Sequence, residues 1–198
     1  MNQSSKESIL QAAYKLFSKH GFSGTSIKMI ADEAQISTSL IFHHFQSKEE
    51  LWVSVERFII KNKKNEPPRI REDSLENFLN DLVGYRLELY KNEEFRRFFN
   101  WRSLEKDPQK FAGIAKMEKI EEPHFFVIPL YVSRLQEKEL IRKDLDSQVI
   151  SIMIFANSSY VVWDFANYYD ISTEKVETHK KFAIQTLTNI LKPFSRVN

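Results

Sequence analysis

Apolar side chains recur at intervals of three and four residues along most of the chain, a spacing that places them on one face of an α-helix. The segment SILQAAYKLFSKHGF shows this spacing at Ile9, Ala12, Ala13, Leu16 and Phe17. Ser4 and Glu7 have the separation of a capping box, and Gly21 is suited to end the helix. The chain is therefore predicted to begin with an amphipathic helix.

Two short helices and the start of a longer one are predicted next. Thr25 is expected to cap a helix of two to three turns in SIKMIADEA. A break over residues 34–37 separates it from a second short helix, which Ser37 caps. Ser47 and Glu50 form another capping box and open the longer helix. The order helix, turn, helix, longer helix follows from these signals.

The stretch NEPPRIRED, which contains Pro67 and Pro68, is the best candidate for a domain boundary. It divides the chain into a helix-turn-helix domain at residues 1–47, a connecting helix at residues 48–66 and a larger helical domain at residues 67–198. Further helices are predicted at residues 73–90, at residues 95–106, from Asp144 or Asp146 to about Tyr169, and at residues 171–194.

Composition also favours an all-α fold. Four glycines and six prolines among 198 residues are too few for the turns of an all-β protein, and the 42% of hydrophobic residues allow a substantial core. Cysteine is absent, which excludes disulfides and thiolate chemistry and fits a reducing cytoplasm. No secretory signal is apparent, and the most apolar run, residues 149–163, is too short to span a membrane. We therefore expect a cytoplasmic protein without a membrane partner.

The segment STSLIFHHF, which begins at Ser37, carries the candidate chemistry. With about 100° between successive residues, Ile41, His44 and Phe45 fall on one side of a helix. The other side carries Thr38, Ser39, Phe42 and His43. His43 and His44 point apart and are poorly placed to share a metal ion, and no metal site or catalytic group is predicted. A short helix with small polar residues at its exposed start, held by a preceding helix, is the device that enters a DNA major groove.

Three further side chains are candidates to contact DNA. Thr25 and Lys48 each lie near a predicted helix start, where side chains and free backbone amides hold phosphates. Lys28 is placed to reach a phosphate or a base edge. Because the net charge of +2 is nearly neutral, the argument for DNA rests on this local arrangement.

Residues 8–51 closely resemble the TetR family of transcriptional regulators. The resemblance rests on ILxAAxxLFxxxGF, on Thr25 and Ser26 opening the support helix, and on the motifs IAxxAxIS, IFxHF and SKExL. It implies an N-terminal DNA-binding domain, a larger helical ligand-binding domain, a homodimer on a palindromic DNA operator, and repression relieved by a small molecule.

By this resemblance, the DNA contacts fall at Thr25, Ser26, Lys28, Thr38, Ser39, Leu40, Phe42, His43 and Lys48. Two positions depart from the family pattern. Ser39 stands where many members have glycine, and Leu40 stands where a small or hydroxyl residue is usual. Base readout at Leu40 is therefore expected to be apolar, for instance to a thymine methyl group.

The C-terminal part of the chain is rich in aromatic residues. Core packing accounts for most aromatic side chains in proteins, but a mostly apolar pocket with a few polar anchors also fits this composition. The candidate ligand-binding residues are Phe95, Phe98, Phe99, Trp101, His124, Phe126, Asn157, Tyr160 and Trp163. Neither a cofactor nor the identity of the effector is indicated.

The last two predicted helices carry apolar faces that suit either intramolecular packing or a dimer interface. The resemblance favours the dimer, because two helices of each subunit form a four-helix interface in the family. The candidate interface residues are Ile150, Ile154, Val161, Phe165, Val176, Phe182 and Ile190.

The leading hypothesis is a homodimeric repressor that a small apolar or aromatic effector releases from DNA by favouring another spacing of the recognition helices. A DNA-binding regulator without small-molecule control is one alternative. An enzyme that uses the aromatic cavity is another, but the chain has no Gly-rich phosphate loop, GxSxG, HExxH or cysteine. We therefore predict a non-enzyme whose partners are operator DNA, a second copy of the chain and an effector.

Overall fold

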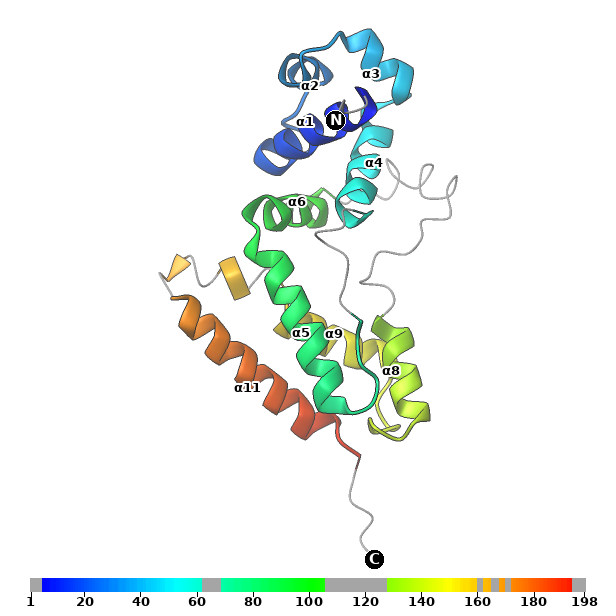
Figure 1. The fold of residues 1–198 in the computed structure, drawn as a ribbon, viewed down its shortest axis with the longest axis vertical. Coiled ribbons are helices and arrows are strands. Elements are labelled where there is room, and N and C mark those ends of the chain that lie inside the picture. Colours follow the sequence, from blue (N-terminus) through cyan, green and yellow to red (C-terminus); the bar gives the residue numbers. More distant parts are fainter. Residues whose placement is uncertain are drawn as a thin grey trace, which may run out of the picture. The chain divides into compact units, whose positions relative to one another are not determined.

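The computed structural model describes residues 5–61, 69–105, 128–159, 162–164, 168–169 and 172–193. The elements in these ranges are all helices, which confirms the all-α prediction (Figure 1). The chain forms two compact units. Unit 1 comprises Met1–Glu66 and Asn92–Glu121, and unit 2 comprises Pro67–Lys91 and Glu122–Asn198.

Unit 1 contains α1 (Ser5–His20), α2 (Ile27–Ala34), α3 (Thr38–His44), α4 (Lys48–Lys61) and α6 (Glu93–Leu104). Gly21 ends α1 as predicted, with a φ of +71° and its N–H bonded to the carbonyl of Phe17 at 2.9 Å. Gln35 ends α2 in the left-handed conformation, and the Ser37 hydroxyl caps α3 by accepting from the Leu40 N–H at 3.3 Å. The helix-turn-helix order is thus confirmed.

The cap of α2 is Ser26, and the prediction of Thr25 is wrong. The Ser26 hydroxyl accepts from the Met29 N–H at 3.2 Å. The Thr25 side chain is buried, and its hydroxyl donates to the Gly21 carbonyl at 2.7 Å. In the sequence, Thr25 and Ser26 are equally suitable as the N-cap. Because the Thr25 side chain is buried, Ser26 takes this role.

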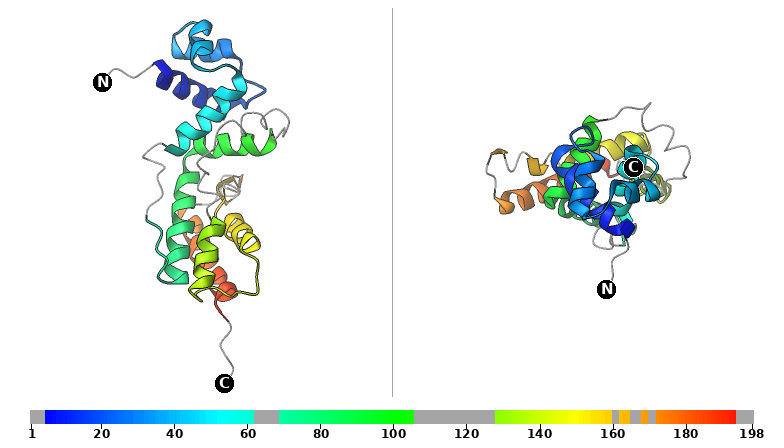
Figure 2. Two further views of the ribbon diagram at one scale, coloured as in Figure 1. Left: turned by 90° about the vertical axis from the view of Figure 1, so that its right-hand side faces the viewer. Right: turned by 90° about the horizontal axis from the view of Figure 1, so that it is seen from above.

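Aromatic side chains form much of the core of unit 1. The indole of Trp52 lies edge-on to Phe17, with ring centroids 4.9 Å apart, and edge-on to Phe22 at 5.7 Å. Phe98 of α6 meets Tyr14 of α1 at 5.9 Å. Phe98 also stacks on Trp52 of α4, and Arg102 of α6 forms an ion pair with Glu56 of α4 at 2.7 Å. The helix α6 therefore packs against α1 and α4 within unit 1 (Figure 2).

The grouping of α6 with unit 1 differs from the predicted domain division, which placed residues 67–198 in one domain. The amphipathic pattern of α6 predicts a buried face that includes Phe95, Phe98 and Phe99, and all three are buried. The pattern does not say which helices this face meets. Only the folded chain shows that its partners are α1 and α4.

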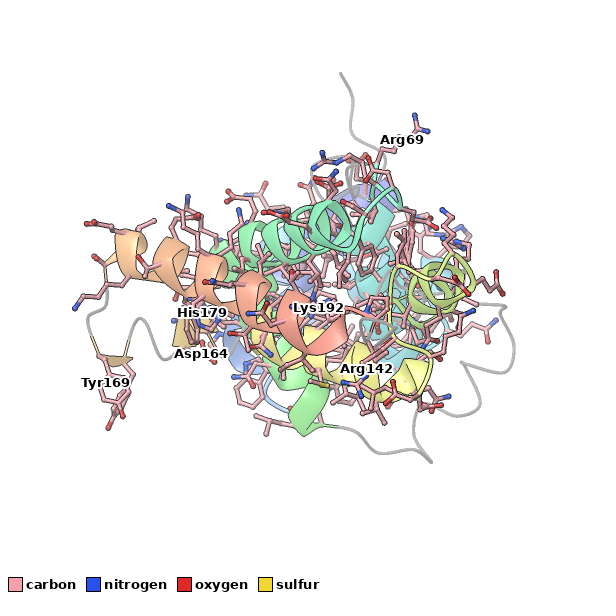
Figure 3. The ribbon with its side chains drawn as sticks, turned by 90° about the horizontal axis from the view of Figure 1, so that it is seen from below. Arg69, Arg142, Asp164, Tyr169, His179 and Lys192 are labelled. Carbon is pink, nitrogen blue, oxygen red and sulfur yellow. The ribbon has the colours of Figure 1, made fainter. Side chains whose placement is uncertain are left out.

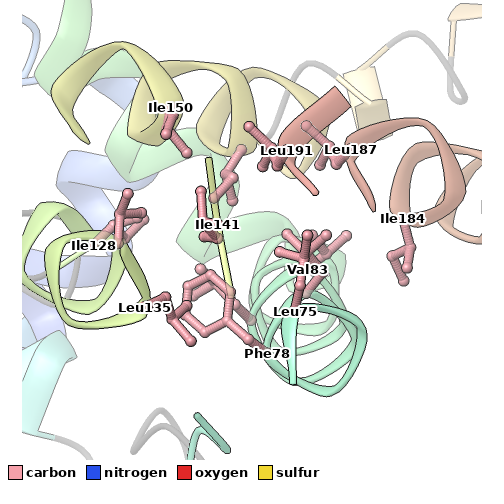
Figure 4. Packing of buried hydrophobic residues seen from close by; sticks show 14 of the residues in the cluster. Leu75, Phe78, Val83, Ile128, Leu135, Ile141, Ile150, Ile184, Leu187 and Leu191 are labelled. Carbon is pink, nitrogen blue, oxygen red and sulfur yellow. The ribbon is translucent and has the colours of Figure 1, made fainter. Parts of the chain in front are cut away.

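Unit 2 contains α5 (Leu75–Lys91), α8 (Ile128–Glu137), α9 (Ser147–Asn157) and α11 (Thr173–Leu191). Figure 4 shows side chains from all four helices directed into one core, among them Phe78, Leu135, Ile150 and Leu187. Arg142 ties the α8–α9 connection to the end of α11, because its backbone N–H donates to the Leu191 carbonyl at 2.9 Å (Figure 3).

The helix predicted to run from Asp144 or Asp146 to about Tyr169 is shorter than expected. Asp146 caps its start, but α9 ends at Asn157. The Asn157 amide donates to the Met153 carbonyl at 2.8 Å, and the Ser158 hydroxyl donates to the Ile154 carbonyl at 2.7 Å. Polar side chains that bond to the backbone in this way compete with continuation of a helix.

No helix in the described ranges has both the length and the apolar character that crossing a bilayer requires.

Candidate nucleic-acid interface

The helix α3 has one buried and one exposed side, as predicted. Ile41 and Phe45 are 0% and 2% exposed. Phe42 is 52% exposed, a large value for a phenylalanine, and its neighbours on the exposed side are Thr38, Ser39 and His43. The buried side holds α3 in place, while the exposed side presents an aromatic ring, an imidazole and two hydroxyls.

The exposed start of α3 is held by a small hydrogen-bond cluster. The Ser37 hydroxyl lies 2.9 Å from the Ser39 hydroxyl while it also caps the Leu40 N–H. Leu40 is half-buried. The first turn of α3 thus places two serine hydroxyls beside a partly buried leucine side chain.

The two histidines of α3 lie in different surroundings. His43 is exposed, whereas His44 is half-buried, with its ring centroid 6.3 Å from that of Phe45. The imidazole rings of His43 and His44 are 5.3 Å apart at an edge-on angle. Among the described residues, no group of three or more His, Asp or Glu side chains is arranged to hold a metal ion.

Ser26 and Lys28, at the start of α2, are both exposed. The buried side of α2 includes Ile30, which is 0% exposed, and α2 packs against both α1 and α3. Ser26 and Lys28 are therefore placed on the same supported helix pair as the exposed side of α3.

Thr25 and Lys48 both have hydrogen-bond partners within the protein. The buried Thr25 hydroxyl is bonded within the protein, so its side chain is not at the surface. The Lys48 ammonium donates to the carbonyls of Phe22 at 2.8 Å and Thr25 at 2.9 Å, and it lies 4.1 Å from the centre of the Phe22 ring. Lys48 thus binds the turn between α1 and α2.

The candidate ligand-binding residues are divided between the two units. Phe95, Phe98, Phe99 and Trp101 belong to α6 in unit 1, and Phe98 stacks on Trp52. In unit 2, the Asn157 carbonyl lies 3.1 Å from His179 Nε2, and the Trp163 indole N–H donates to the Leu87 carbonyl at 2.8 Å. His124, Phe126 and Tyr160 lie outside the described residues.

The candidate dimer residues separate into buried and exposed sets. Ile150, Ile154 and Val176 are at most 3% exposed within the single chain, so the prediction that they face a second copy is wrong. Phe182 and Ile190 are 68% and 38% exposed. Val161 and Phe165 lie outside the described residues. Ile150 and Ile154 lie on the buried side of α9, and Val176 lies on the buried side of α11.

The exposed large apolar side chains of α9 are Val149, Ile152 and Phe155. They follow one another at intervals of three residues and form a single stripe on the helix. The sequence did not separate this stripe from the buried one, because α9 is apolar on almost every side.

Sequence reasoning also missed Arg86 in unit 2, which is 2% exposed. Its Nε donates to the Ser158 hydroxyl at 2.7 Å, and its guanidinium lies 4.3 Å from the centre of the Phe155 ring. Burial lowers the pKa of Arg86 to about 10. Arg86 lies three residues after Val83 and four before Tyr90, both of which are buried. This helical spacing was the signal in the sequence that Arg86 is buried as well.

The comparisons with known proteins agree with this geometry. The family model described as "Bacterial regulatory proteins, tetR family" matches residues 9–55. The chain is 34% identical over 93 residues to the HTH-type transcriptional repressor NicS of Pseudomonas putida, covering 46% of this chain and 44% of that protein. It is 40% identical over 68 residues to the HTH-type transcriptional regulator YerO of Bacillus subtilis, covering 34% of this chain and 24% of that protein. The matches therefore span less than half of either relative.

Solved structures of the same fold cover nearly the whole chain. A TetR-family transcription regulator from Shewanella sp. PV-4 matches with a TM-score of 0.71 and 19% identity, over 96% of this chain and 98% of that chain. The regulator FadR from Bacillus subtilis, solved in complex with stearoyl-CoA, matches with a TM-score of 0.66 and 16% identity, over 91% and 96% of the two chains. At these identities the likeness is one of fold.

Proposed function

We propose that this chain, which belongs to the TetR family of bacterial regulatory proteins, is a transcriptional regulator that reads DNA with the exposed side of α3. The observation that carries the proposal is the contrast between the buried Ile41 and Phe45 and the exposed Phe42 and His43. A helix fixed in this way offers side chains to base edges in the major groove.

The proposed contacts divide into two kinds. Ser26 and Lys28 at the start of α2 are suited to hold backbone phosphates, which positions the protein without reading sequence. Ser39, Leu40 and Phe42 on α3 are suited to base edges, with the apolar side chains directed to thymine methyl groups. An operator rich in A·T pairs at the positions under Leu40 and Phe42 is the expected preference.

The protein would act as a homodimer that pairs the exposed apolar stripe of α9 with the exposed apolar positions of α11. Ile152 and Phe182 are 67% and 68% exposed in the single chain, and burial of such side chains favours association. A two-fold dimer binds two half-sites about 34 to 36 Å apart, which corresponds to a palindromic operator.

We further propose that the protein is a repressor and that a small apolar or aromatic effector releases it from DNA. Two observations on other proteins support this choice: NicS is a repressor, and FadR, which shares the fold, binds stearoyl-CoA in its solved structure. An effector that binds one conformation more tightly shifts the population towards it. Long-chain acyl-CoAs and small aromatic compounds are suitable first probes.

The decisive experiment is selection of bound sequences from random DNA by the full chain, followed by affinity measurements on the selected site. The double variant Phe42→Ala/His43→Ala should weaken binding at least about tenfold, because each lost base contact costs about 1–3 kcal/mol. The matched control, Tyr168→Ala/Tyr169→Ala, removes two exposed aromatic side chains from unit 2 and should bind normally. Recovery of no preferred sequence, or equal binding by the two double variants, would contradict the proposal.

A further inference from the structure

The turn between α1 and α2 is held from one side by Lys48. As described above, its ammonium donates to the carbonyls of Phe22 and Thr25. These two carbonyls flank the middle of the turn. Since α2 begins only two residues after Thr25, the direction of these peptide groups sets how the chain enters α2.

The same turn is held from another side by Glu105, which follows the last residue of α6. Its two carboxylate oxygens accept from the Ser23 N–H at 3.3 Å and 3.2 Å. The Glu105 N–H donates to the Trp101 carbonyl at 2.9 Å, so the backbone of this residue is fixed to the final turn of α6. The residues Ser23 and Glu105 are 82 positions apart in the sequence.

A second observation shows that the end of α6 lies directly on this turn. A Cβ atom added to Gly21 would lie 2.7 Å from the Glu105 Oε1 and 2.9 Å from two ring carbons of Trp101. Such distances are shorter than van der Waals contact. Glycine at position 21 therefore permits both the left-handed end of α1 and the close approach of α6.

We propose that Glu105 is a positioning residue for the DNA-binding helices. Its carboxylate and the Lys48 ammonium together fix the N–H and carbonyl groups of the α1–α2 turn. They thereby fix the start of α2 and the orientation of α3, which packs on α2. This inference rests on the proposed DNA-binding function. It adds a residue that acts through the α1–α2 turn and lies at the end of a helix outside the family-matched segment.

Charge gives this arrangement its strength. Hydrogen bonds with a charged partner contribute more than neutral ones. Here the Glu105 carboxylate accepts from the Ser23 N–H, and the Lys48 ammonium donates to two backbone carbonyls. Any change that withdraws the end of α6 from Gly21 removes the acceptor of the Ser23 N–H. The orientation of α3 then loses one of its constraints, although no residue of α3 has changed.

The test compares the full-length wild type with Glu105→Ala and Glu105→Gln. The first readout is hydrogen exchange of the Ser23 amide, followed by NMR, and the second is affinity for the DNA site selected by the wild type. Glu105→Ala should raise both the exchange rate and the dissociation constant by about tenfold. Glu105→Gln keeps an acceptor oxygen and should restore a large part of both. Glu93→Ala, which removes another carboxylate from α6 far from the turn, is the control.

The outcomes separate the two proposals. If Glu105→Ala leaves the Ser23 exchange rate or the DNA affinity at the wild-type value, the positioning role is overturned. If the wild type selects no DNA sequence, the proposed function itself fails. If Glu105→Ala is too unstable to measure, Glu105→Met decides, because it keeps the length of the side chain and removes the acceptor oxygens: reduced affinity with raised Ser23 exchange supports the role, and unchanged affinity overturns it.

Discussion

The indole ring of Trp52 in α4 stacks on the phenyl ring of Phe98 in α6, with centroids 4.6 Å apart and planes inclined by 27°. Phe98 is fully buried in this position. We expect Phe98→Ala to destabilise unit 1 by about 3–5 kcal/mol, because it removes a buried aromatic ring and leaves a cavity. Leu104→Ala on the same helix, 71% exposed, should change stability by about 0.5 kcal/mol or less. Urea unfolding measures both, and equal effects would contradict the packing described.

The roles of Lys28 and Lys48 should differ in their dependence on salt. If exposed Lys28 contacts a phosphate, Lys28→Ala should reduce the slope of log affinity against log salt by about 1. Lys48→Met should lower the affinity without changing the slope, because its ammonium binds the Phe22 and Thr25 carbonyls. Fluorescence anisotropy on the selected site provides both slopes. An equal loss of slope in Lys48→Met would show that this side chain reaches a phosphate.

The exposed stripe of α9 and the exposed face of α11 should control assembly. Ile152→Asp and Phe182→Asp are each expected to shift a dimer towards monomer, because they place a charge where apolar surface is proposed to be buried. Leu130→Asp introduces the same charge at an exposed leucine of α8 and serves as the control. Light scattering after size-exclusion chromatography gives the mass of each variant. A monomeric wild type would rule out the dimer.

In unit 2, two adjacent buried serines should respond differently to truncation. Ser158 accepts from Arg86 Nε at 2.7 Å and donates to the Ile154 carbonyl at 2.7 Å. We expect Ser158→Ala to cost about 1–3 kcal/mol, because it removes a bond to a buried charged group. Ser159 makes a longer bond, 3.5 Å to the Ala156 carbonyl, so Ser159→Ala should cost less. Thermal unfolding of the two variants measures both losses of stability. A larger loss of stability for Ser159→Ala than for Ser158→Ala would contradict the prediction.

The ion pair between Glu72 and Arg134 should contribute to stability only above acidic pH. Hydrogen bonds from Arg134, at 2.9 Å to each carboxylate oxygen, hold the pKa of Glu72 below its ordinary value. The stabilisation is complete above the pKa of the unfolded chain and is lost as pH falls through the lower pKa of the folded one. Since the Arg134 side chain is 46% exposed, we expect Glu72→Gln to cost about 1 kcal/mol or less at pH 7.

Urea unfolding of the wild type and of Glu72→Gln at pH 7 and at about pH 3 measures this change. The difference between the two proteins should shrink at the lower pH, where the wild-type carboxylate is increasingly protonated. Glu76→Gln, at an exposed position near the start of α5, is a control for charge alone. A difference that persists or grows on acidification would contradict the assigned ion pair.

The sequence sufficed to predict the elements of the helix-turn-helix segment because their signals are local. Gly21 and Ser37 act through hydrogen bonds to residues three or four positions away, and these spacings are visible in the sequence. The exposed side of α3 follows from helical periodicity in the same way. Such local signals do not identify the N-cap where two neighbouring residues both carry a hydroxyl, as Thr25 and Ser26 do. The burial of Thr25 then determines which residue caps the helix.

Long-range partners could not be predicted from periodicity. The aromatic residues of α6 were expected to line a pocket in the C-terminal domain, but the choice between that domain and unit 1 depends on contacts between distant segments. The bond between Ser23 and Glu105 has the same character. In α9, apolar residues occupy nearly every side, so the sequence does not distinguish Ile150 in the core from Ile152 at the surface.

The packing of Phe98 between Trp52 and Tyr14 also bears on the order in which the protein is made. During synthesis, the helices α1 to α4 leave the ribosome first, and α5, which belongs to unit 2, follows before α6 appears. Domains generally fold as units as the chain emerges. The core formed by α1 to α4 is therefore complete only after residue 105 has been made, and a nascent chain that stalls within α5 carries the helix-turn-helix segment without the helix that completes its core.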